Sequence, residues 1–68
     1  MTAKEIRDMI KTAKRRARNV YAKFKNLSGE GLPPVRLINA REKDGFTQAL
    51  TISGRWVDID LHTVVYEQ

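Results

Sequence analysis

A segment rich in glycine and proline, residues 28–34, divides this 68-residue chain into two parts whose apolar residues follow different periods. Before the segment, apolar residues recur every three or four positions, which is typical of an amphipathic helix. After it, short apolar runs are separated by glycine-containing turns, which is typical of strands. Because a helix and a sheet each bury one apolar face, we expect a single α+β domain over residues 1–68.

The N-terminal part is predicted to form one long helix over residues 2–27. Thr2 and Glu5 have the spacing of a capping box, in which each side chain accepts a hydrogen bond from the other residue's backbone N–H. Apolar residues with helical spacing follow at Ile6, Met9, Ile10, Ala13, Ala17, Val20, Tyr21, Phe24 and Leu27. At about 100° per residue these positions share one face of the helix.

Three strands are predicted after the loop at 28–34, over residues 35–41, 46–53 and 56–66. The Asp44-Gly45 and Gly54-Arg55 pairs between them are strong hairpin signals. The expected fold is therefore α-β-β-β, with one long amphipathic helix on a three-stranded antiparallel meander. A 26-residue helix would span about 39 Å, more than the length of such strands, so it would overhang the sheet. A homodimer could cover the overhang.

The predicted register of the second hairpin decides which side chains face the helix. Centring its turn on residues 54–55 pairs Leu50 with Ile59 and gives each strand one apolar face. The core face then carries Phe46, Gln48, Leu50, Ile52, Val57, Ile59 and Leu61. The first strand stays open: Leu37 faces the core if its loop has two or four residues, and Ala40 does so if the loop has three.

Positive charge is concentrated in the first 26 residues, which carry a net charge of +7, whereas the remainder carries −2. Most of the basic side chains fall within one arc of the predicted helix, where like charges at neighbouring positions destabilise it slightly. The residues of this stripe are Lys4, Arg7, Lys11, Lys14, Arg15, Arg18 and Lys25. An unbalanced basic stripe favours an anionic partner, and its steps of about 5–6 Å suit successive phosphates. The leading hypothesis is that the chain is a small protein that binds DNA or RNA with low sequence specificity.

The main alternative is a compact interaction or inhibitor protein, of a phage or mobile-element type, that docks on an acidic protein surface. Trp56 and Tyr66 are predicted on the outer sheet face and would act as its anchors, because these residue types dominate protein contacts. Stacking of nucleobases on them is disfavoured by the two aspartates between them in sequence, Asp58 and Asp60. Two interpretations without a binding function remain open. In one, Trp56 only covers the edge of the sheet; in the other, the basic residues only keep the protein soluble.

Catalysis and metal binding are not expected, and no cofactor is predicted. Asp58, Asp60 and His62 alternate along the third predicted strand, but same-face neighbours there are about 7 Å apart, which is wide for sharing one ion. They are more simply the polar face of a sheet. The chain contains no cysteine, which favours a reducing cytoplasm. Binding to a membrane is not expected, because the sheet needs the helix's apolar face.

Overall fold

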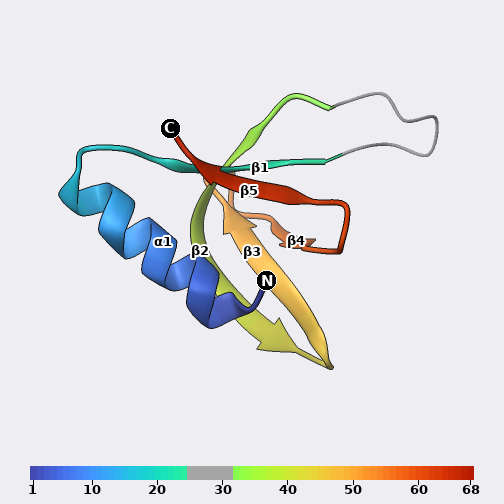
Figure 1. Ribbon diagram of the computed structural model, residues 1–68. Coiled ribbons are helices and arrows are strands. Elements are labelled where there is room, and N and C mark those ends of the chain that lie inside the picture. The colour runs from blue at the N-terminus through green and yellow to red at the C-terminus, as the bar shows by residue number, and fades with distance from the viewer. Residues whose placement is uncertain (25–31) are drawn as a thin grey trace.

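The structure is a computed structural model that describes residues 1–24 and 32–68 (Figure 1). Within these residues, one helix precedes five strands. They are α1 (Ala3–Arg15), β1 (Val20–Lys23), β2 (Val35–Lys43), β3 (Phe46–Thr51), β4 (Trp56–Asp58) and β5 (Val64–Glu67). The strands form one antiparallel sheet in the order β4-β3-β2-β1-β5. The domain is α+β, but the predicted three-stranded meander is wrong, because two further strands lie beside it.

The start of α1 is as predicted and its end is not. The Glu5 N–H donates to Thr2 Oγ1 at 3.2 Å, and the Thr2 N–H donates to Glu5 Oε1 at 2.9 Å, which completes the capping box. The backbone hydrogen bond from Thr2 lowers the pKa of the Glu5 carboxyl, which the Thr2 side chain reinforces. The predicted helix over 2–27 is wrong beyond Arg15, and its last residues, 25–27, lie outside the described part of the chain.

The helix ends in a Schellman motif. Ala17 adopts the left-handed conformation with a φ of 54°, so the chain turns away from the helix axis. The Arg18 N–H donates to the Ala13 carbonyl at 2.8 Å, and the Ala17 N–H donates to the Lys14 carbonyl at 3.2 Å. These bonds satisfy carbonyl groups that the last helical turn would leave unpaired. The chain then enters β1, which pairs with β2 on one side and β5 on the other.

The predicted strand over 56–66 is split into β4 and β5, which lie at opposite edges of the sheet. The Ile59 N–H still donates to Thr47 O, and the Thr63 N–H closes a turn on Asp60 O. Because such a turn spans under about 7 Å, the link from Ile59 to Val64 covers at most about 15 Å. A flat five-stranded sheet would be about 19 Å wide. The sheet must therefore curl, and Figure 1 shows the chain turning directly from β4 into β5.

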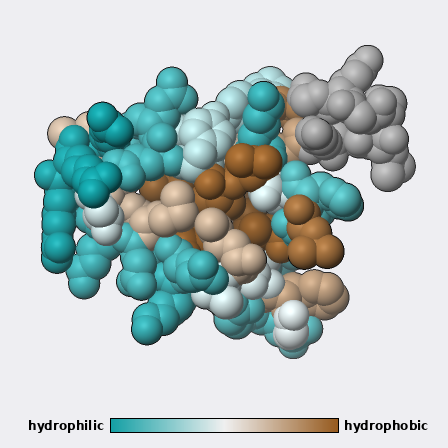
Figure 2. Space-filling model, in the orientation of Figure 1, coloured by the Kyte–Doolittle hydropathy of each residue, from teal (hydrophilic) through white to brown (hydrophobic). Residues whose placement is uncertain are grey.

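The core lies between α1 and the inner face of the curled sheet. Its buried apolar residues are Ala3, Ile6, Ala13, Val20, Ala22, Leu37, Ala40 and Ala49. Five of these eight are alanines, which allow the helix backbone to approach the sheet closely. Large hydrophobic side chains are left exposed, and Figure 2 shows apolar surface beside the hydrophilic surface of α1.

The predicted register of the second hairpin is wrong by three residues. Leu50 pairs with Trp56, because a three-residue turn over 52–54, with Gly54 at a φ of 88°, replaces the two-residue turn. An odd shift reverses the faces of a strand. Ala49 is consequently buried, whereas Phe46 is 64% exposed.

The first hairpin has a two-residue turn, Asp44-Gly45, with both residues at positive φ. That loop length pairs Ala40 with the buried Ala49 and so places Ala40 inward, whereas the sequence predicts Leu37 for a two-residue loop because it takes the opposite face of β3 as the core face. A β-bulge between Leu37 and Asn39 then shifts the phase of β2, so Leu37 is also buried. The structure thus contains part of each alternative.

The observed register predicts opposite effects for two substitutions in β3. Ala49→Leu should destabilise the fold by about 1–3 kcal/mol, because it inserts volume beneath α1. Phe46→Lys should change the free energy of unfolding by less than about 0.5 kcal/mol, because the side chain is exposed. Urea unfolding followed by circular dichroism measures both. If Phe46→Lys lowered the free energy of unfolding more than Ala49→Leu does, the register predicted from the sequence would be supported instead.

Candidate functional site

Two long-range contacts fix α1 along β2. Glu42 Oε1 accepts hydrogen bonds from the Ala3 N–H at 2.9 Å and from the Thr47 hydroxyl at 3.0 Å. A carboxylate at this end of the helix also complements its dipole. One turn further along, Arg7 Nη1 donates to the Ala40 carbonyl at 3.0 Å. These contacts set the distance between the helix and the strand.

A groove lies between α1 and β2, at the point where β1 and β2 diverge. It consists of a cavity of about 240 Å³ and a second one of about 160 Å³, and both are lined by Ile10 and Ile38. We call it the basic groove. Its polar lining is Arg7, Lys11, Lys14, Arg18, Asn19, Arg36 and Asn39, and its apolar lining is Ile10, Val20, Leu37 and Ile38. Every charged residue that lines it is basic.

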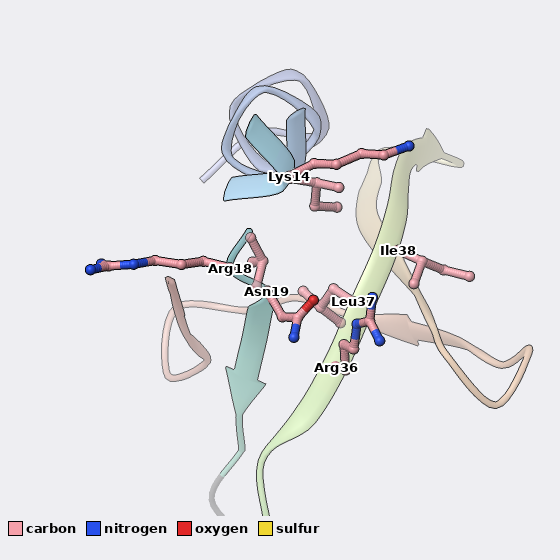
Figure 3. Close-up of a pocket in the computed structure, with 8 residues that line it drawn as sticks. Lys14, Arg18, Asn19, Arg36, Leu37 and Ile38 are labelled. Atoms are coloured by element: carbon pink, nitrogen blue, oxygen red, sulfur yellow. The ribbon is translucent and has the colours of Figure 1, made fainter. Parts of the chain in front are cut away.

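Figure 3 shows how the side chains of the larger cavity are arranged. Lys14 extends from the helix toward β2, Asn19 lies between β1 and β2, and the Arg36 side chain lies against β2. Arg18 extends away from these three, so its guanidinium group does not join them. The helix and the sheet therefore supply cations from two sides of the groove.

The structure brings some of the predicted basic stripe together and leaves the rest apart. Arg7, Lys11 and Lys14 line the basic groove from the helix, and Arg18 lines it from the segment after the helix. Lys4 and Arg15 are exposed on α1 but do not line it, and Lys25 lies outside the described residues. Arg36 is a groove residue that the charge pattern of the sequence does not indicate, because it lies in residues 27–68, whose net charge is −2.

The opposite flank of α1 is acidic. A shallow depression there is lined by Met1, Glu5, Asp8, Met9, Thr12 and Glu67. Arg16 Nη1 lies 3.5 Å from Glu67 Oε2, and this partly exposed pair ties the end of the helix to β5. The helix therefore separates an acidic flank beside β5 from a basic flank beside β2.

The two aromatic residues predicted as anchors lie on opposite edge strands. Trp56 is in β4, where the Arg41 guanidinium sits 3.9 Å above its ring centroid. Gln48 accepts a hydrogen bond from Arg41 and donates one to Asp58, each at 3.0 Å. Tyr66 is in β5 and stacks on Tyr21 of β1, with 5.9 Å between ring centroids. Trp56 and Tyr66 therefore do not form one anchoring patch.

The predicted alternation of Asp58, Asp60 and His62 along one strand is wrong. Asp60 lies in the turn after β4, where its carboxylate accepts hydrogen bonds from the His62 N–H at 2.8 Å and the Thr63 hydroxyl at 3.0 Å. The backbone bond from His62, followed by the Thr63 hydroxyl, lowers the pKa of Asp60. Over residues 1–24 and 32–68, no three His, Cys, Asp or Glu side chains gather in a way that could hold a metal ion.

Comparison of the chain with protein-family models, curated proteins and solved structures finds no match. The part of the chain that the structure describes contains no helix that could span a bilayer.

The end of α1, which delivers Arg18 and Asn19 to the groove, is predicted to be strained at Ala17. Ala17→Gly should stabilise the fold by about 1 kcal/mol, because glycine adopts a positive φ without the steric cost of a Cβ. For a domain of this size the melting temperature should rise by roughly 4–8 °C. Thermal unfolding measures the change. The matched variant Ala17→Val should melt below the wild type, and a destabilising Ala17→Gly would contradict this account of the helix end.

Proposed function

We propose that this small basic protein binds the nucleic-acid backbone, with low sequence specificity, through its basic groove. The observation that carries the proposal is that cations from both α1 and β2 line a groove with an apolar floor, without an acidic residue in the lining. A cytoplasmic location, which the sequence favours, is part of the same proposal.

The spacing of these cations suits a row of phosphates. Arg7, Lys11 and Lys14 follow one another on the helix at steps of about 5–6 Å, and Arg36 of β2 lines the larger cavity together with Lys14. Contacts to phosphate fix the position of a nucleic acid but carry no sequence information. Asn19 and Asn39 add neutral hydrogen-bonding groups, which are able to contact base edges or sugars.

The competing hypothesis is an interaction or inhibitor protein whose basic groove receives an acidic segment of a protein partner. Its support is weaker here, because Trp56 and Tyr66 are separated across the sheet. α1 has 13 residues and spans about 20 Å, so it does not produce the overhang from which a dimer was expected.

The salt dependence of binding tests the proposed function. For a labelled single-stranded oligonucleotide of about 12 nucleotides, fluorescence anisotropy should give a dissociation constant that rises steeply with salt concentration. Lys14→Gln/Arg36→Gln should weaken binding and lower the slope of log K against log salt by about 1.4, since each phosphate contact contributes about 0.7 on a single strand.

The control is Lys43→Gln/Arg55→Gln, which removes the same charge from residues that do not line the groove. It should leave the slope nearly unchanged. Equal weakening by both pairs would contradict a defined groove and indicate an effect of net charge only. Absence of nucleic-acid binding, together with groove-dependent binding of a poly-glutamate peptide, would favour the acidic protein partner.

A further inference from the structure

The stacked tyrosines of β1 and β5 form a second feature of the surface beside the basic groove. Tyr21 pairs directly with Tyr66 across the two strands, and their rings lie at an interplanar angle of 27°. Val20 and Ala22, which flank Tyr21, are buried on the inner face. The alternation of a strand therefore places the tyrosine pair on the outer face, where both side chains stay partly exposed.

The groove and the tyrosine pair are continuous through Arg36. This residue lines the groove and is also the register partner of Tyr21 in β2. Neighbouring strands are about 5 Å apart, so a phosphate held by Arg36 would bring its nucleotide within reach of Tyr21. On the far side, Lys23 lies two residues along β1 and pairs with Val64. Asn19 and Gln68 continue the ladder at the other end, so the neighbours of the pair on this face are basic, apolar or neutral polar residues.

Trp56 is a poorer surface for a base than this pair. Its ring already carries the Arg41 guanidinium, and Asp58, two residues along the same strand, adds a negative charge that repels phosphate. Asp58 and Asp60, the two aspartates that disfavour base stacking at the level of the sequence, lie between Trp56 and Tyr66 along the chain. In the fold, Asp58 shares a strand with Trp56 at the other edge of the sheet, and Asp60 lies in a turn.

We propose that the Tyr21–Tyr66 pair is a stacking platform for unpaired nucleobases, which makes single-stranded nucleic acid the ligand of the basic groove. This inference rests on the proposed function. Aromatic side chains bind any base through its π-face, so stacking adds affinity without sequence specificity. The bases of a duplex are already paired and stacked, and cannot use the platform without being extruded.

Binding of a labelled oligothymidylate and of a DNA duplex of the same length tests the platform. Tyr66→Leu should weaken single-strand binding at least about fivefold, as expected for loss of one stacked base. It should leave the salt slope and the duplex affinity unchanged, because no phosphate contact is lost. Tyr66→Phe keeps the ring and should bind within about twofold of the wild type. An equal loss for both ligands, or no loss for either, would overturn the platform.

Crosslinking of the unmodified chain provides a test that does not depend on the folding of a variant. An oligonucleotide that carries 5-iodouracil should crosslink on irradiation to Tyr21 or Tyr66, as located by mass spectrometry. Crosslinks confined to other residues would overturn the inference.

The two proposals fail in different ways. If Lys14→Gln/Arg36→Gln reduces binding while Tyr66→Leu and the crosslinks show no stacking, the groove remains the binding site and only the platform is rejected. If the groove variants bind as tightly as the wild type, the proposed function is rejected, and the platform with it.

Discussion

The structure depends on the pairing of β1 with two neighbours at once. Val20–Lys23 is only four residues long, yet it joins β2 to β5 and so closes the gap between the hairpins and the end of the chain. It can do so only because α1 stops at Arg15 and Ala17 reverses the chain. A continuous helix would leave β5 without a partner strand, and its backbone groups would have to find water instead. Two ladders of hydrogen bonds outweigh the cost of one positive φ.

The alanine-rich core explains why this pairing matters so much. Each buried alanine removes little apolar area from water, so burial alone contributes less than in a core of leucines. Because their side chains are small, the alanines allow the helix to pack close to the tightly curled sheet. Directional contacts then carry more of the specificity, such as the Glu42 carboxylate at the helix start and the Arg7 bond to the Ala40 carbonyl.

Local chemistry in the sequence predicted the points where elements begin and turn, but not how far they extend. Thr2 with Glu5, and Asp44 with Gly45, each determine a motif from adjacent residues alone. Val20 fits both the helical spacing from Ala17 and the strand alternation with Ala22, so the choice depends on β2 and β5. In β3 the two faces are Phe46, Gln48 and Leu50 on one side and Thr47, Ala49 and Thr51 on the other. The rule that larger apolar residues face inward fails there because α1 leaves room only for small ones.

Local sequence patterns likewise predicted only part of the candidate site. Helical spacing predicted that Arg7, Lys11 and Lys14 share a flank, because that relation is local. Arg36 joins them only through the pairing of β1 with β2 and the bulge beside Ile38, which no local pattern indicates. A count of charge along the chain assigned Arg36 to the acidic part of the sequence. Charge along a sequence and charge over a surface are different quantities once strands return to the same helix.

The arrangement of charge around α1 also means that the net charge understates the potential of the groove. Glu5 and Asp8 line one flank of the helix, whereas the groove occupies the other. A helix with its side chains is about 10–12 Å across, and the Debye length at physiological salt is about 8 Å. Glu5 is thus separated from the groove by roughly the full width of the helix, whereas Asp8 is three residues before Lys11 and lies closer to it. The cations of α1 and β2 therefore act on an anion in the groove with less opposition than the net charge of the whole chain, +5, indicates.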